Sequence, residues 1–203
     1  MSNRKNYYNI SVFGSHHPPS SEVKDLINEL AKIVACFGNN KFAFYHGGGG
    51  GIMKELATVA NKFGIKSIGI GTREYHENSL ETPRTGDDFI MADNIFDRVR
   101  NMVASSWLTV SLPEGGGGTE FETLGAFYAL RTLTFREKNG EKIPFVDERR
   151  LIAMGDMGKR LNEHISLYNL WKKPGIKNRV IILNDNRELG RLIKKLLLER
   201  LAG

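Results

Sequence analysis

The residues best suited to chemistry lie in "LPEGGGGTEFETLG", residues 112–125. Four glycines, Gly115, Gly116, Gly117 and Gly118, directly precede a segment with the composition of a helix. A glycine turn lets the backbone approach an anion closely, and the first amides of the following helix donate hydrogen bonds toward it. We interpret this turn as a phosphate-binding site; the alternative is that the glycines serve only a tight turn.

Thr119 and Glu122 stand three residues apart at the start of the same segment. The spacing Thr-x-x-Glu fits a capping box, in which the two side chains satisfy the first amides of a helix. On spacing alone, the capping box is the favoured interpretation of the two residues.

A second glycine turn lies in "FYHGGGGGIMKE" and includes Gly48, Gly49, Gly50 and Gly51. His46 precedes it and could approach a ligand or serve only for packing. Neither turn continues into a Walker loop, and Ile52 stands where the motif G-x-G-x-x-G needs its last glycine. If the two turns end neighbouring parallel strands, they flank one crevice, the usual ligand position in an open α/β sheet.

Strand-like runs alternate with helical stretches along most of the chain. We expect strands at 8–13, 41–46, 66–71, 107–112 and 179–184, with helices between them that include 22–38, 94–106 and 119–133. This alternation predicts one α/β domain over residues 1–203, with a doubly wound, Rossmann-like, mostly parallel sheet and helices on both faces. Residues 134–178 fit the alternation poorly, and we interpret them as an insertion with a helix around 157–171 that forms a lid or an oligomer contact.

The composition, 40% apolar and 26% charged, is that of a soluble globular protein. The net charge of +6 comes largely from a C-terminal segment patterned as an amphipathic helix, so we expect no nucleic-acid partner. The chain has no membrane-length apolar run and no signal-peptide core, so we expect no membrane partner and a cytoplasmic protein. The single cysteine, Cys36, is expected in the core. No His, Cys, Asp or Glu cluster has metal-ligand spacing, so we expect no metal.

Several motifs follow one another in an order that resembles a known family. Gly118, Thr119 and Glu122 close a G-T-x-x-E motif, and Arg98 lies fifteen residues before Pro113, with Met102 four residues after it. Upstream stand "VFGS", which contains Gly14 and Ser15, and "YHGGGGGIMKELA". In these motifs, over about residues 8–133, the chain resembles the LONELY GUY family of phosphoribohydrolases, which activate cytokinins and were once misannotated as lysine decarboxylases.

The resemblance implies hydrolysis of the N-glycosidic bond of a nucleoside 5′-monophosphate, AMP or an N6-modified AMP, to the free base and ribose 5-phosphate, with no cofactor. It implies that the glycine turns and Thr119 hold the 5′-phosphate. Glu122 would face the ribose and stabilise an oxocarbenium-like transition state, and Arg98 would supply a fixed cation toward the phosphate or the sugar hydroxyls. On the residues alone, Arg98 could equally be a surface arginine. The resemblance also implies a homodimer or a larger homo-oligomer.

Three positions depart from the family pattern. Glu114 lengthens the loop between proline and threonine by one residue, Val99 replaces a lysine, and Phe96 replaces the usual histidine. Other functions on the same scaffold therefore stay open: a pyrimidine nucleotide hydrolase, a deoxyribosyl transferase, or a nucleotide or molybdenum-cofactor carrier that performs no hydrolysis.

Overall fold

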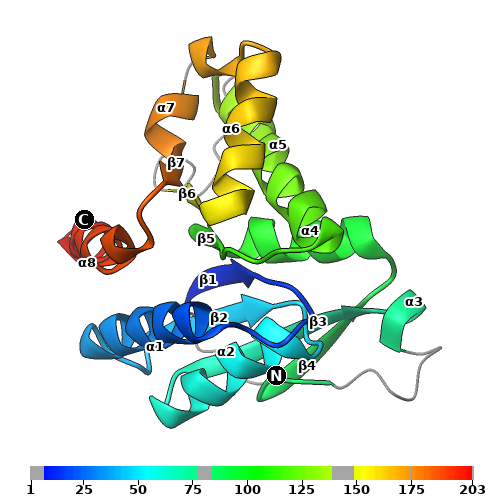
Figure 1. Ribbon diagram of the computed structural model, residues 1–203, viewed down its shortest axis with the longest axis vertical. Helices are drawn as coiled ribbons and strands as arrows, with labels where there is room; N and C mark the ends of the chain where they lie inside the picture. The colour runs from blue at the N-terminus through cyan, green and yellow to red at the C-terminus, as the bar shows by residue number, and fades with distance from the viewer. Residues whose placement is uncertain (1–6, 77–83, 139–148, 174, 203) are drawn as a thin grey trace.

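Seven parallel strands form one sheet in the order β4-β3-β2-β1-β5-β6-β7 (Figure 1). The computed structural model describes residues 7–76, 84–138, 149–173 and 175–202. The strands are β1 (Tyr8–Phe13), β2 (Phe42–His46), β3 (Lys66–Thr72), β4 (Asp88–Ala92), β5 (Leu108–Ser111), β6 (Arg150–Met154) and β7 (Val180–Leu183). The predicted doubly wound, Rossmann-like α/β fold is confirmed.

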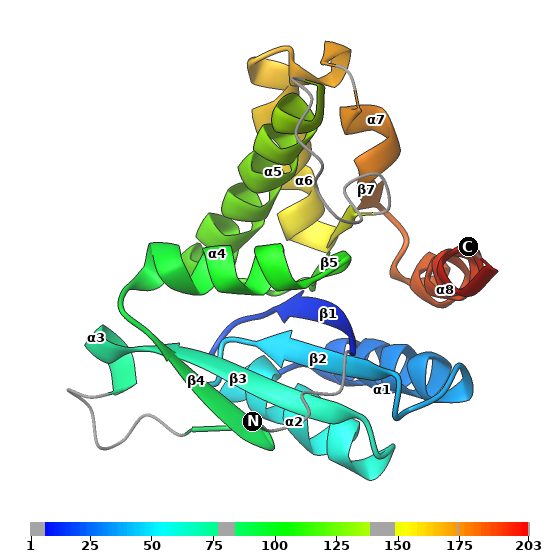
Figure 2. The same ribbon diagram turned by 180° about the vertical axis from the view of Figure 1, so that it is seen from behind.

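Helices cover both faces of the sheet. They are α1 (Ser21–Cys36), α2 (Gly51–Lys62), α3 (Arg73–His76), α4 (Ile95–Ser105), α5 (Gly117–Lys138), α6 (Gly155–Leu167), α7 (Ile176–Arg179) and α8 (Leu189–Ala202), with 3-10 turns η2 (Leu170–Lys172) and η3 (Asn186–Glu188). Helix α1 packs between α2 and α8, whereas α5 packs between α4 and α6. In Figures 1 and 2, α1 and α2 lie side by side against β1 to β4, and α5 runs beside α6.

Two apolar clusters fill the space between the sheet and these helices. One joins the buried stripe of α1 with α2, α8 and the central strands, and the other joins α4, α5 and α6 to the opposite face. Strands buried on both faces read as continuous apolar runs, as the first four residues of β2 (FAFYH) do here. Helix α1 has its buried residues at helical spacing, and its N-cap Ser20 accepts a hydrogen bond from the Val23 amide at 3.3 Å.

The interpretation of residues 134–178 as an insertion is wrong. Strand β6 lies within this segment and pairs in parallel with both β5 and β7, so the segment continues the alternation of the fold. The helix expected around 157–171 corresponds to α6 and η2, and residues 139–148 lie outside the described residues.

Cys36 is exposed, which corrects its expected place in the core. It is the last residue of α1, whose buried positions include Leu30 and Val34. Two residues beyond Val34, the helix has turned by about 200°, so Cys36 lies off the buried stripe.

Candidate functional site

The topological switch point of the sheet lies between β1 and β5. Strands β2, β3 and β4 extend the sheet on one side of β1, and β5, β6 and β7 extend it on the other. Ligands of open α/β sheets bind at such a point, beyond the carboxyl ends of the strands. The loops after β1 and β5 therefore border the expected site.

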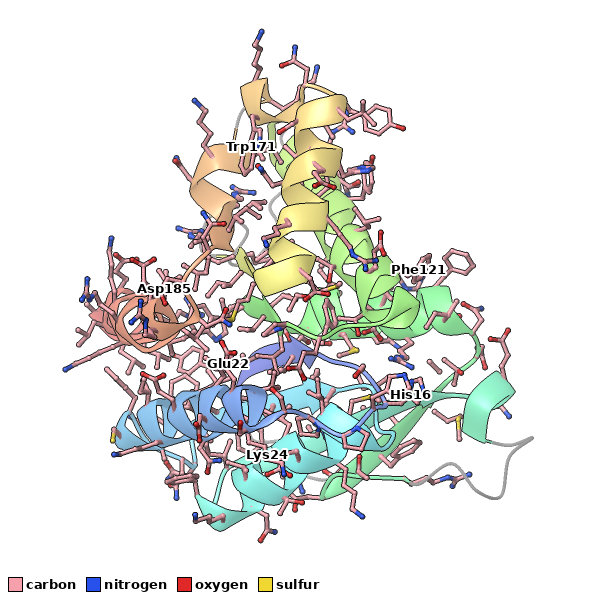
Figure 3. The ribbon with its side chains drawn as sticks, in the orientation of Figure 1. His16, Glu22, Lys24, Phe121, Trp171 and Asp185 are labelled. Atoms are coloured by element: carbon pink, nitrogen blue, oxygen red, sulfur yellow. The ribbon has the colours of Figure 1, made fainter. Side chains whose placement is uncertain are left out.

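The two glycine turns do not end neighbouring strands, because β1 lies between β2 and β5. Both strands pair directly with β1. The two turns therefore lie at the same edge of the sheet, one on each side of the loop that follows β1. Figure 3 shows His16, from that loop, and Phe121, from the start of α5, on the same side of the molecule.

The glycine turn after β5 leads straight into α5, a helix of 22 residues that begins at Gly117. Gly116, Gly117 and Gly118 are exposed, none has a left-handed φ, and a Cβ atom on any of them would meet nothing within 4 Å. Neither backbone strain nor packing requires glycine at these three positions. The bare backbone therefore leaves open space at the N-terminus of a long helix, where anions bind favourably. Gly115 differs, since a Cβ there would press on Thr119 and on Met157.

Thr119 lies inside α5, as its third residue, and is buried. Its carbonyl accepts a hydrogen bond from the hydroxyl of Thr123 at 2.6 Å, and Thr123 also contacts the hydroxyl of Ser111, on β5, at 2.6 Å. These contacts fix the first turns of α5 against the end of β5. The capping-box interpretation is wrong, because the carboxylate of Glu122 is directed to Arg98 and not to the amide of Thr119.

Arg98 and Glu122 form an ion pair between α4 and α5. Nη2 of Arg98 donates a hydrogen bond to Oε1 of Glu122, and the exposed fractions of the two side chains are 11% and 3%. Local packing explains the approach of the helices, since Gly125 on α5 leaves room for Val99 on α4. The pair joins two residues 24 positions apart that the sequence analysis had assigned to catalysis.

The pKa of Glu122 is unusually high for a carboxylate that is paired with an arginine. Burial raises the pKa of Glu122, while the charge and hydrogen bond of Arg98 act in the opposite direction, and the pKa stays above its ordinary value. Nε of Arg98 is buried without a hydrogen-bond partner. The guanidinium therefore keeps one donor unused beside a buried carboxylate.

Gly47, the first residue of the turn after β2, lies against Arg98. A Cβ atom on Gly47 would lie 2.5 Å from Nη2 of Arg98 and 2.5 Å from Sδ of Met53. Because Gly47 has no side chain, the guanidinium group of Arg98 can pack against it. The sequence analysis did not assign this role to Gly47, although the residue belongs to the glycine run that it singled out.

The fold itself accounts for several other glycines of this run. Gly48 has a φ of +74° and lies against Phe89, whereas Gly51 has a φ of +59° and lies against the backbone of His16 and His17. Gly49 lies against Met53, and Gly50 is the N-cap residue of α2, without a side-chain cap. Phosphate binding by Gly48, Gly49, Gly50 and Gly51 stays a prediction, since packing or a left-handed φ suffices to explain glycine at Gly48 and Gly51.

His46, the last residue of β2, is a buried packing residue beside this turn. Its Nδ1 accepts a hydrogen bond from the Gly48 amide at 3.1 Å, and its Nε2 lies 3.0 Å from the hydroxyl of Ser67. Burial, followed by the charge of Arg98, lowers the pKa of His46 to about 4, against a smaller opposing effect of Asp87. The imidazole is therefore neutral near pH 7 and holds the glycine turn in place.

Gly14 and Ser15 follow β1 and belong to the packing between β1 and α2. A Cβ atom on Gly14 would overlap the side chain of Ile52, and the carbonyl of buried Ser15 accepts a hydrogen bond from the Ile52 amide at 3.0 Å. Both residues therefore position the loop at the switch point. Within the described residues, no group of three His, Cys, Asp or Glu side chains could hold a metal ion.

No protein-family model matches the chain, and no curated protein matches it. Solved structures with the same fold include the molybdenum cofactor binding protein from Rippkaea orientalis, at 21% identity and a TM-score of 0.63, covering 97% of this chain and 99% of that one. They also include the molybdenum cofactor carrier protein from Chlamydomonas reinhardtii, at 20% identity and a TM-score of 0.62, covering 95% and 99% of the two chains. These likenesses show the fold over nearly the whole chain. No helix within the described ranges has the length and apolar character needed to span a membrane.

Proposed function

We propose that this chain is a phosphoribohydrolase of the LONELY GUY type, which hydrolyses the N-glycosidic bond of a nucleoside 5′-monophosphate. One observation carries the proposal: the bare N-terminus of α5 and Glu122, which pairs with Arg98 of α4, lie at the same end of one helix. The substrates that we propose are AMP or an N6-modified AMP.

The spacing along α5 suits a ribose 5-phosphate. From Gly118 to Glu122 the helix rises by about 6 Å, since each residue adds about 1.5 Å. A phosphate bound to the first amides of α5 would thus leave the sugar beside the turn that carries Glu122. The other two glycines of the open turn, Gly116 and Gly117, provide the space for the phosphate oxygens.

Glu122 is the proposed catalytic carboxylate. Cleavage of a glycosidic bond develops positive charge on the sugar ring, which a nearby carboxylate stabilises. The bond between the base and C1′ breaks, the base leaves with a proton, and the oxygen of water joins C1′, giving the free base and ribose 5-phosphate. Arg98 would favour the charged form of Glu122, because its charge and its hydrogen bond lower the pKa that burial raises.

A second candidate function is that of a carrier that binds a phosphorylated cofactor without hydrolysing it. The fold favours this candidate, since the two solved proteins described above are titled as binding or carrying the molybdenum cofactor. A carrier needs the anion site at α5 but needs no carboxylate of raised basicity beside it. The two candidates therefore differ in the role of Glu122.

The test compares the wild type with Glu122→Gln on a panel of nucleoside 5′-monophosphates that includes AMP. Any released base is identified by chromatography. We expect the wild type to release a base, and the variant to lose at least about a hundredfold in turnover, equivalent to about 3 kcal/mol of barrier. Glu120→Gln is the matched control, because Glu120 lies on the same helix and pairs with Arg160 instead.

The variant will also melt earlier, because glutamine leaves the Arg98 charge without its counter-ion. Turnover per folded molecule is therefore the decisive quantity. A Glu122→Gln protein that turns over the nucleotide at the wild-type rate would contradict the catalytic role. Tight nucleotide binding by the wild type with no base released would favour the carrier.

We also propose that the chain assembles into a homodimer or a larger homo-oligomer. Phe96 on α4 and Phe121 on α5 support this proposal, because they remain 69% and 37% exposed. Their rings lie edge to face, with the ring centroids 5.5 Å apart. An exposed aromatic pair is typical of an association surface. Light scattering at micromolar concentration should give at least twice the mass of the chain, and Phe96→Ser with Phe121→Ser should reduce it.

A further inference from the structure

Glu114, in the turn after β5, has an unusual conformation and two unusual contacts. Its φ is 62°, in the left-handed region that favours glycine, and its side chain is exposed. Its amide donates a hydrogen bond to Oδ1 of Asp156 at 3.0 Å, and its Oε2 accepts one from the amide of Ser20 at 3.1 Å. Glu114 thus connects the turn after β5 to the start of α1 and to the start of α6.

The amide that Glu114 contacts lies in a specific place. Ser20 is the N-cap residue of α1, the 16-residue helix that follows β1 at the switch point. In doubly wound folds, the diphosphate of a dinucleotide lies against the N-terminus of this first helix. Here a carboxylate of the chain itself accepts a hydrogen bond at that N-terminus, whereas a Cβ atom on Gly116, Gly117 or Gly118, at the start of α5, would meet nothing within 4 Å.

We propose that Glu114 determines the specificity of the site by restricting it to ligands with a single phosphate group. The inference rests on the proposed phosphate site at the start of α5. One phosphate binds at Gly116, Gly117 and Gly118, and a second one, reaching toward α1, would meet the carboxylate of Glu114. The repulsion of two anions and the loss of the Ser20 amide as a donor both act against a diphosphate.

An alternative role for Glu114 is that of a brace, which holds the loops together and has no effect on the choice of ligand. A brace would change the affinity for every anion by a similar factor. A residue that excludes the second phosphate changes the ratio of the affinities for a diphosphate and a monophosphate. The ratio therefore separates the two roles.

The experiment measures the binding of inorganic phosphate and of pyrophosphate by calorimetry at fixed ionic strength, so that it depends neither on the base nor on hydrolysis. Glu114→Gly is the main variant, since glycine adopts the left-handed φ without strain and removes the carboxylate. Glu114→Gln keeps the length of the side chain and removes only its charge, and it decides the question if the glycine variant fails to fold. Glu120→Gln removes a neighbouring charge that contacts Arg160 and not α1.

We expect Glu114→Gly to improve the affinity for pyrophosphate relative to phosphate by about tenfold or more, equivalent to about 1.4 kcal/mol. Glu114→Gln should shift the ratio in the same direction by a smaller factor, and Glu120→Gln should leave it unchanged. An unchanged ratio in both Glu114 variants would overturn the inference, and so would an equal shift in Glu120→Gln, which would indicate a general charge effect. A wild-type protein that binds neither anion would refute the proposed phosphate site itself, and this inference with it.

Discussion

Replacing Gly117 with alanine should make the protein more stable and its ligand affinity worse. Gly117 is the first residue of α5, and a Cβ atom there would meet nothing within 4 Å. The new methyl group therefore costs no packing energy, and it removes the conformational freedom that glycine has in the unfolded chain. Substitutions of this kind stabilise proteins by about 0.4–1 kcal/mol.

The size of the effect on the thermal midpoint follows from the size of the protein. For 150–250 residues, about 1 kcal/mol shifts the midpoint by about 2–4 °C. We therefore expect Gly117→Ala to melt about 1–4 °C above the wild type. The same methyl group occupies the space proposed for the phosphate, so the affinity for inorganic phosphate should fall by about tenfold or more, equivalent to about 1.4 kcal/mol.

The assay combines thermal unfolding followed by circular dichroism with calorimetric binding of inorganic phosphate. Gly14→Ala serves as the contrasting control, because its methyl group would overlap Ile52 and should destabilise the protein by about 1–3 kcal/mol. A Gly117→Ala protein that binds phosphate as tightly as the wild type would refute the reasoning, since the open space would then have no ligand to accommodate.

Two further predictions concern the other glycine turn. Gly47→Ala should displace Arg98 from Glu122, because the added Cβ would lie 2.5 Å from Nη2 of Arg98. We expect a loss of about 1–3 kcal/mol of stability, together with reduced turnover. A melting point equal to that of the wild type would contradict the contact. His46 has a pKa of about 4 in the folded protein, against 6.5 when unfolded, so the unfolded state binds more protons and stability should fall as the pH decreases from about 6.5 to 4. His46→Gln should lose this contribution. Chemical denaturation of both proteins between about pH 4 and 6.5 would measure it as the difference between their slopes of unfolding free energy against pH. The carboxyl groups that the two proteins share contribute equally to both slopes and cancel in the difference.

The sequence predicted the fold well because parallel strands, glycine turns and helices follow one another in a strict order. It failed at β6 for a physical reason. The strand "RLIAM" is only five residues long, begins at the second of two adjacent arginines and has no polar-apolar alternation, so it resembles a short piece of a buried helix as much as a strand. Only its pairing with β5 and β7 decides its conformation.

The two glycine turns show what sequence can and cannot predict about a site. Both look alike as runs of glycine, yet the turn after β2 packs against His16 and Phe89, which lie far away in the chain. No local pattern contains these contacts. The ion pair of Arg98 and Glu122 is also a contact that no local pattern contains. Thr-x-x-Glu satisfies the local rule for a capping box, but Glu122 instead accepts a hydrogen bond from Arg98 on α4, 24 residues upstream.

Two features at the start of α5 are not required by the fold. A buried ion pair adds little net stability compared with well-packed apolar residues, because the removal of both charges from water costs about as much as their attraction returns. Three exposed glycines at a helix start reduce stability relative to alanine, and nothing in the packing explains them. A protein shaped by stability alone would have neither feature. The glycines and Glu122 stand within two turns of one helix, so the phosphate ligand that we propose, with its sugar beside Glu122, would account for both.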